Sequence, residues 1–307
     1  MTLPFWFKGD LPNLFIGISL GLIINSLVMA WSLKRKHLTK WASITAFLMG
    51  FTTWIIEPSL FIGLVLFFFS SSLLTKFKNA KKARALELAS KGGERDTLQV
   101  LANVSVVCVG AIFDFIVSCL APYYTIAFLF AAFSALAASI ADTWATEIGT
   151  LSREAPRSIL DLRKKVEPGT SGGITRLCTI EAILGSSAIV TVGYIIARFT
   201  GSAMAFSNVV FLSIIIGIAF GIGGCFLDSG LGATIQGFYK CHVCGKNTEK
   251  TVHCNEKTML LRGKKWFGND LVNFLSTIFA GVGTFAAIIV LYGIPLKYCY
   301  NSNNCCR

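Results

Sequence analysis

Acidic residues beside long apolar stretches are the clearest candidates for chemistry in this sequence. In the segment 141–149, Asp142 and Thr146 would share one face of a continuing helix, while Glu147 is rotated away from them. Asp228 follows another apolar stretch, at the same expected membrane depth and on the same side. Mg²⁺ takes oxygen ligands from one or two carboxylates plus phosphate, so we predict that Asp142 and Asp228 share Mg²⁺. Glu147 is a further candidate ligand.

A glycine-rich segment precedes the apolar stretch that begins near residue 174. Consecutive backbone N–H groups there can converge on a phosphate, and the N-terminus of the following helix adds partial positive charge. An ordinary turn with a Thr or Ser N-cap explains the segment equally well. The candidate nucleotide-binding residues are Gly169, Thr170, Ser171, Gly172 and Gly173.

Two further polar residues enter apolar stretches from the same end. Asn103 and Glu181 each lie roughly 10 Å deep at a helical rise of 1.5 Å per residue, so five polar groups are expected to converge near one leaflet. A hydrogen bond between helices is an equally good explanation for Asn103 and Glu181. Asp114, nearer the opposite face, is expected to be structural.

A pair of short cysteine and histidine motifs predicts a candidate metal site. Cys241 and Cys244 are followed by His253 and Cys254, a spacing that suits a small structural Zn²⁺ loop. Adjacent His253 and Cys254 cannot easily bind one ion, and the interval between the pairs is short. Free thiols are therefore the alternative interpretation.

The composition shows what must position these residues. Of 307 residues, 54% are hydrophobic and 14% charged, and the mean hydropathy is +0.65, which exceeds what one soluble core would bury. Most charge-poor stretches reach the ~20 residues that a spanning helix needs. We predict an all-α fold, a polytopic transmembrane bundle of about eight spans forming one integral membrane domain over residues 1–307. The stretches cover 11–33, 41–56, 59–74, 97–120, 123–141, 174–197, 208–227 and 271–294, the second and third being short.

Basic residues predict the orientation of the chain, because Lys and Arg collect on the cytoplasmic side. With eight spans, one side receives all 28 basic residues except Lys8, Arg198, Lys297 and Arg307. Three cytoplasmic loops follow: a basic loop over 75–96, a glycine-rich loop over 142–173 and a cysteine-containing loop over 228–270. Both termini are then non-cytoplasmic. This bias accounts for the net charge of +12 and argues against nucleic-acid binding. The pattern specifies neither an organelle nor an oligomeric state.

Four motifs carry a family resemblance, which runs from about residue 39 to 276. They are residues 99–103 (QVLAN), 141–149 (ADTWATEIG), 168–173 (PGTSGG) and 231–236 (LGATIQ). The chain resembles the transmembrane protein 19 family, which includes plant phytyl-phosphate kinases, and is distantly similar to dolichol kinases and phosphatidate cytidylyltransferases. The resemblance implies nucleotide-dependent chemistry on lipid phosphates. The sequence departs from the cytidylyltransferases in having Lys164-Lys165-Val166 where those have Lys-Lys-Thr.

The leading hypothesis is therefore transfer of a phosphoryl group from a nucleoside triphosphate, with CTP as one candidate, to an isoprenoid monophosphate in the membrane. In this hypothesis Lys164 or Lys165 neutralises the transferred group and Asn103 orients a phosphate oxygen. A multi-pass transporter or flippase is the alternative, since Glu181 and Asp114 would equally line a pathway. A non-catalytic scaffold whose cysteine loop recruits a partner is a third hypothesis.

Overall fold

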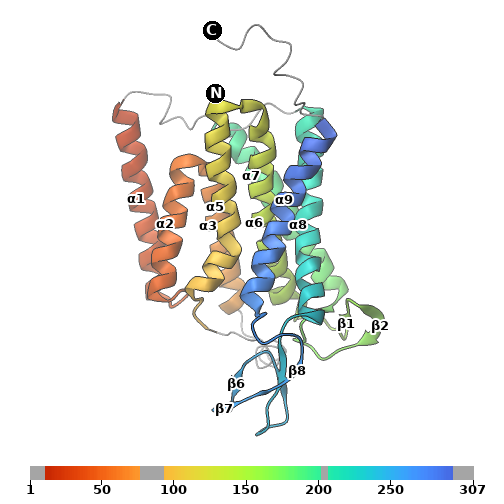
Figure 1. The fold of residues 1–307 in the computed structure, drawn as a ribbon. Coiled ribbons are helices and arrows are strands. Elements are labelled where there is room, and N and C mark those ends of the chain that lie inside the picture. Colours follow the sequence, from red (N-terminus) through yellow and green to blue (C-terminus); the bar gives the residue numbers. More distant parts are fainter. Residues whose placement is uncertain (1–10, 77–92, 202–206, 293–307) are drawn as a thin grey trace.

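The computed structural model describes residues 11–76, 93–201 and 207–292 (Figure 1). Within these ranges the chain forms eight α-helices, seven of which are long and apolar enough to cross a membrane. The polytopic helical bundle predicted from the sequence is confirmed. The predicted basic loop over 75–96 falls largely on residues 77–92, outside the described residues. The helices are α1 (Leu11–Lys34), α2 (Lys40–Ile56), α3 (Pro58–Lys76), α5 (Thr97–Leu120), α6 (Thr125–Gly149), α7 (Arg176–Phe199), α8 (Asn208–Thr234) and α9 (Asn269–Tyr292).

Side-chain caps fix where several helices begin. Thr39, Asp96, Thr175 and Ser207 each accept a hydrogen bond from a backbone N–H in the first turn of the helix that follows. The second predicted span is short, as expected, because α2 has only 17 residues. Helix α6 continues past residue 141 to Gly149, so Asp142 and Glu147 are helical residues.

Short strands pair into small sheets at one end of the bundle, here called the loop face. The strands are β1 (Arg157–Ser158), β2 (Asp161–Lys165), β3 (Gly173–Ile174), β4 (Phe238–Lys240), β5 (Asn247–Thr248), β6 (Val252–His253), β7 (Glu256–Lys257) and β8 (Met259–Arg262). They pair in the orders β2-β1-β3, β5-β4-β8 and β6-β7, all antiparallel. No pattern in the sequence predicted these strands. Helix α1 begins, and α9 ends, at the end of the bundle opposite the loop face (Figure 1).

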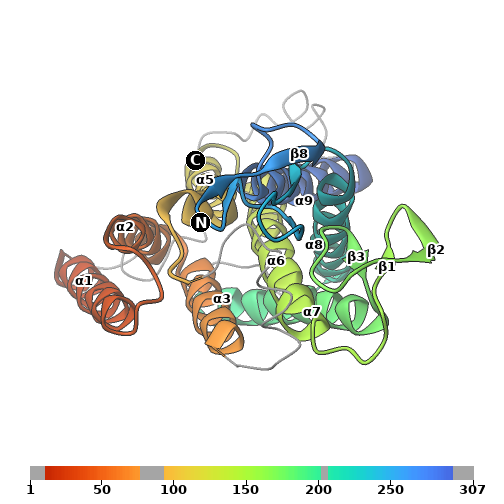
Figure 2. The same cartoon turned by 90° about the horizontal axis from the view of Figure 1, so that it is seen from below.

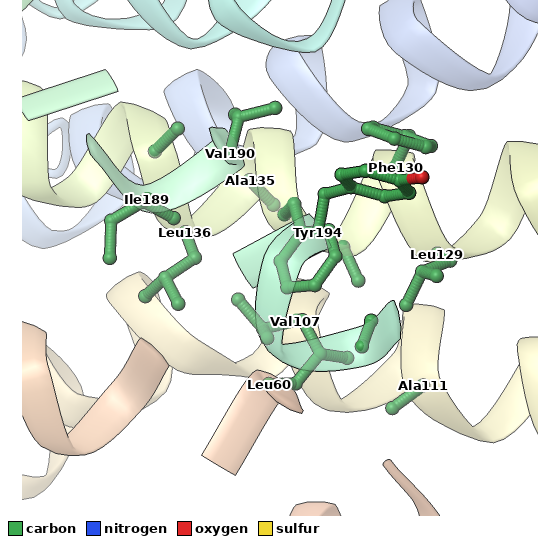
Figure 3. Close-up of a cluster of buried hydrophobic side chains, with 14 of the residues drawn as sticks. Leu60, Val107, Ala111, Leu129, Phe130, Ala135, Leu136, Ile189, Val190 and Tyr194 are labelled. Carbon is green, nitrogen blue, oxygen red and sulfur yellow. The ribbon is translucent and has the colours of Figure 1, made fainter. Parts of the chain in front are cut away.

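Helix α6 is the centre of the bundle. It contacts α3, α5, α7, α8 and α9, and Figure 2 shows these helices around it while α1 and α2 lie at one edge. Phe130, Phe133 and Leu136 of α6 are almost completely buried, and they pack with Leu60 of α3 and Val190 of α7 (Figure 3). The hydrophobic core therefore surrounds α6 along most of its length.

Small residues allow the neighbouring helices to approach α6 closely. Alanines of α6 face glycines of four other helices. A methyl group added to any of these glycines would lie 2.7–3.4 Å from an atom of the facing alanine. Helices in lipid associate mainly through van der Waals packing, so such small-residue contacts fix their positions. The facing pairs are Gly110–Ala132 from α5, Gly185–Ala141 from α7, Gly221–Ala137 and Gly224–Ala138 from α8, and Gly281–Ala131 from α9.

Two glycines of α8 provide a matched test of this packing. A methyl group on Gly221 would lie 2.8 Å from Cβ of Ala137, whereas one on Gly230 would meet nothing within 4 Å. We expect Gly221→Ala to destabilise the bundle by ~1–3 kcal/mol, because overpacking forces neighbours apart. Gly230→Ala should leave stability unchanged or slightly increased. Thermal unfolding in detergent measures both, and equal apparent Tm values for the two variants would contradict the packing argument.

Candidate functional site

A large cavity opens between the bundle and the loops of the loop face. Its volume is about 1840 Å³, larger than the ~300–1,000 Å³ typical of a site for one small ligand. One part of its wall is polar and comes from the end of α6, the glycine-rich loop and the end of α8. Another part is apolar and includes Phe47, Phe61, Leu64 and Phe68 from α2 and α3. The cavity therefore has room for a polar and an apolar ligand together.

Asp142 and Asp228 lie together on the polar wall, as the sequence analysis expected. Asp142 is on α6 and Asp228 on α8, and their carboxylates interact electrostatically. Among the described residues, Oδ2 of Asp228 is buried and has no hydrogen-bond partner. Ser276 of α9 is within hydrogen-bonding reach of the same carboxylate. Two neighbouring carboxylates with an unsatisfied oxygen suit a hard divalent cation such as Mg²⁺.

Glu147 also lines the cavity but has other partners. Its Oε1 accepts a hydrogen bond of 2.6 Å from Thr75 Oγ1 of α3, and its charge interacts with Arg95. Its carboxylate thus braces α6 against α3 and the segment before α5. Glu147 lines the same cavity as Asp142 and Asp228, and its role as a third ligand stays a prediction.

The glycine-rich loop is fixed against the end of α8. Gly172 has φ +82°, and a methyl group there would be 3.0 Å from Cα of Ala233. The hydroxyl of Ser171 donates to Oε1 of the buried Gln236 at 3.2 Å. The N–H groups of Thr170 and Gly173 donate to carbonyls inside the loop itself. The loop, including Gly169, lines the cavity, but these two amides are committed to the turn and do not face a ligand.

Other polar residues named by the sequence analysis are divided between the cavity and its surroundings. Asn103 lines the cavity, and its Nδ2 donates to the carbonyl of Gln99 at 2.8 Å within its own helix. Glu181 is not among the residues that line the cavity. Asn103 thus reaches the cavity that holds Asp142 and Asp228, whereas Glu181 does not line it.

The basic residues at the cavity differ from those expected. Lys164 and Lys165 lie on β2, are exposed, and do not line the cavity; Figure 2 shows β2 at the periphery. This corrects their predicted role beside the transferred phosphate, because β2 extends away from the bundle. Among the described residues, the Lys and Arg side chains that line the cavity are Lys36, Lys76, Arg95, Arg153 and Lys246.

His37 and Arg95 form a part of the wall that the sequence analysis missed. The backbone N–H of Arg95 donates to the carbonyl of His37 at 2.9 Å, and Nη1 of Arg95 donates to Ser71 at 3.1 Å. The His37 ring stacks on Trp31 with centroids 4.6 Å apart. Burial lowers the pKa of Arg95, while the Glu147 charge acts in the opposite direction. No sequence motif links these residues, because only the fold brings them together.

The cysteine-containing loop forms a compact group of possible metal ligands. One ligand atom from each of Cys241, Cys244, His253 and Cys254 lies within 4.8 Å of all the others. His253 Nδ1 is 3.5 Å from Cys244 Sγ and 3.2 Å from Cys254 Sγ. A hydrogen bond from the Cys244 backbone N–H is the main cause that lowers the pKa of Cys241 to about 6. Cys244 also lines the cavity, so this loop covers part of the site.

Comparison with known proteins identifies the family. Residues 23–281 match the family described as integral membrane protein DUF92. The chain belongs to this family. Protein PGR of Arabidopsis thaliana is 30% identical to it over 282 residues, which cover 88% of this chain and 96% of that protein. The family assignment made from the four motifs is thereby confirmed.

The DUF92 match includes every residue that lines the cavity, from Asn25 to Asn273. A second relative, an uncharacterized membrane protein of Methanocaldococcus jannaschii, is 35% identical over 103 residues, or 34% of this chain and 38% of that protein. No solved structure matches this DUF92 chain. In the described part of the chain, the cavity is therefore built from the region that the family match covers.

The pH dependence of stability tests the environment of His37. Burial, followed by the charges of Lys76, Arg95 and Arg35, lowers the pKa of His37. Below the unfolded-state pKa of about 6.5, the unfolded chain binds more protons at this residue, so acidification destabilises the folded state. We expect the apparent Tm to fall less between about pH 7.5 and 5.5 in His37→Gln than in the unmodified protein.

Thermal unfolding in detergent over a pH series measures this difference. His242→Gln is the control, because His242 is exposed on the cysteine-containing loop and lies outside the cavity. It should retain the original pH dependence. An identical pH dependence in His37→Gln would show that His37 does not titrate differently on folding.

Proposed function

We propose that this DUF92 protein is a membrane-embedded kinase that transfers a phosphoryl group from a nucleoside triphosphate to an isoprenoid-lipid monophosphate such as phytyl phosphate. CTP is the candidate donor. The observation that carries the proposal is one cavity whose polar wall holds Asp142 and Asp228 and whose apolar wall lies among the helices. The resemblance to a family that includes plant phytyl-phosphate kinases supports the same reaction class.

The polar wall suits the phosphates of both substrates. Asp142 and the unsatisfied Oδ2 of Asp228 fit Mg²⁺, which when bound neutralises phosphate oxygens and orients the donor. Arg95, Arg153 and Lys246 place positive charge on the same cavity. The glycine-rich loop supplies close backbone approach beside the start of α7.

The apolar wall suits the hydrocarbon part of an isoprenoid. Asn25 and Met29 of α1 line the cavity along with Phe47, Phe61 and Leu64 of α2 and α3. Helices α1 and α3 are long and apolar enough to cross a membrane, and α2, with 17 residues, lies between them in the chain. An acceptor held there would present its phosphate to the loop face while its tail stays in an apolar environment.

The proposed step needs no strong base. An oxygen of the lipid monophosphate attacks the γ-phosphorus of the donor, and the bond from that phosphorus to the β,γ-bridging oxygen breaks. The products are a lipid diphosphate and a nucleoside diphosphate. A phosphate monoester has its second pKa near 6, so the attacking oxygen is already ionised near neutral pH. The protein therefore contributes positioning and charge neutralisation.

A direct assay tests the proposal. Purified protein in detergent with Mg²⁺ receives CTP or ATP together with phytyl, farnesyl or geranylgeranyl monophosphate, and lipid diphosphate is quantified. We expect product with the unmodified protein and a loss of at least ~100-fold in Asp142→Asn and in Asp228→Asn, since each substitution removes a carboxylate from the ion site. Asp161→Asn is the matched control, because Asp161 is exposed on β2 and outside the cavity. Full activity in both site variants would refute the assignment.

The corrected set of cations gives a second test. Arg153 and Lys164 are both exposed, but only Arg153 lines the cavity. We expect Arg153→Gln to raise the KM for the nucleotide by about tenfold, because the loss of one hydrogen bond from a charged donor costs ~1.5 kcal/mol. Lys164→Gln should leave KM and kcat unchanged. The opposite ranking would favour the original sequence-based role for Lys164.

One observation favours the second candidate function, a transporter or flippase without nucleotide chemistry. Asp114 of α5 is buried, its Oδ1 has no hydrogen-bond partner among the described residues, and its charge interacts with the buried Glu57. Buried acidic pairs in membrane helices often mark ion pathways. Asp114→Asn would impair transport but spare the kinase reaction. Lipid movement in proteoliposomes without any nucleotide would support this alternative.

A further inference from the structure

We propose that Cys241, Cys244, His253 and Cys254 bind one Zn²⁺ ion, which fixes the cysteine-containing loop over the cavity. The site is independent of the proposed kinase reaction. Among the described residues, these four form the group of at least three His, Cys or acidic side chains whose geometry suits a metal. Three thiolates and one imidazole are a preferred ligand set for Zn²⁺.

The distances in the group match tetrahedral coordination. With Zn–S near 2.3 Å and Zn–N near 2.0–2.1 Å, a tetrahedron places sulfur and nitrogen ligands about 3.5 Å apart and sulfurs about 3.8 Å apart. His253 Nδ1 lies 3.5 Å from Cys244 Sγ and 3.2 Å from Cys254 Sγ. All four atoms lie within 4.8 Å of one another. A central ion requires only small side-chain adjustments.

Two tight turns bring the ligands together. Cys241 and Cys244 lie in the connection between β4 and β5, where the N–H of Gly245 donates to the carbonyl of Cys241 at 3.0 Å. Gly245 has φ +71°, which glycine adopts without strain. This turn places both sulfurs on one side of the hairpin.

The second turn allows the adjacent residues His253 and Cys254 to bind the same ion. Cys254 and Asn255 connect β6 to β7, and their φ values are +52° and +62°. Positive φ at both central residues is the type I′ hairpin turn, which a cysteine rarely occupies. It brings the Cys254 sulfur beside Nδ1 of its neighbour His253. The unusual backbone is therefore explained by ligand placement.

The loop also lacks other means of holding its shape. Strands β5, β6 and β7 have two residues each, and an isolated hairpin is marginal in water. From 238 to 262, the side chains that are buried in the described structure are few, namely Tyr239, Cys241 and Thr248. Small units without a core are commonly stabilised by a metal or a disulfide, and these cysteines are free.

Charge in the loop complements the proposed centre. Zn²⁺ with three thiolates and one neutral imidazole carries a net charge of about −1. The loop from 238 to 262 has five cationic and two anionic side chains, Lys240, Lys246, Lys250, Lys257 and Arg262 against Glu249 and Glu256. Lys246 and Asn247 line the cavity next to Cys244, so an ordered loop holds them over the site.

Metal content tests the proposal without any lipid or nucleotide. Full-length protein, purified in detergent with reductant, incubated with Zn²⁺ and desalted, is analysed by inductively coupled plasma mass spectrometry. We expect about one zinc per chain. His253→Ala and Cys244→Ser should each lower bound zinc at least ~10-fold after desalting, because three remaining ligands bind Zn²⁺ weakly. Two matched controls, His242→Ala and Cys119→Ser, change residues outside the group and should retain one zinc.

One further variant and a metal replacement test the site even if another variant misfolds. His253→Cys replaces imidazole with thiolate, so it should fold and retain zinc. Co²⁺ in place of Zn²⁺ should give the intense sulfur-to-cobalt absorption of a tetrahedral thiolate site, absent in Cys244→Ser. Three outcomes would overturn the proposal: no zinc in the unmodified protein, undiminished zinc in both His253→Ala and Cys244→Ser, or a Cys241–Cys244 disulfide in protein alkylated before lysis.

Discussion

The close approach of four helices to α6 is the constraint on which the rest of the structure depends. Membrane helices gain little hydrophobic free energy by associating, so their association relies on shape. Alanines of α6 opposite glycines of α5, α7, α8 and α9 remove the side-chain volume that would separate the backbones. Because α7 and α8 meet α6 this closely just before Asp142, the end of α8 brings Asp228 to the same place.

Most of the bundle was predictable because hydropathy reports directly on burial in lipid. The predicted stretch over 97–120 coincides with α5, and the other stretches overlap their helices. The ends of α6 and α8 were underestimated, since helices continue into water where side chains are polar. Strands of two residues have too few positions to show an alternating pattern, so the sheets of the loop face had no detectable signal.

The candidate site was predictable only where membrane depth determines position. Asp142 and Asp228 follow apolar stretches, so their common depth could be inferred, and their proximity agrees with it. Lys164 precedes the glycine-rich segment closely in sequence, yet the antiparallel pairing of β1 and β2 directs it outward. His37 and Arg95 are far apart in sequence and meet through backbone pairing between the segments before α2 and α5. A local sequence pattern does not show that two segments distant in sequence lie side by side in the fold.

Helix α9 covers one face of α6 and is the last of the described helices to be synthesised. α9 packs against α5, α6 and α8 together, and Thr277 Oγ1 donates to the carbonyl of Ala102, 175 residues earlier in the chain. During synthesis, α6 is therefore completed long before α9, one of the helices that cover it. Until the ribosome has completed Tyr292, the small-residue surface of α6 and the carboxylate of Asp142 lack their final protein neighbours. Contacts between such distant segments form slowly, so the face of α6 that α9 covers is the last part of its surface to be buried.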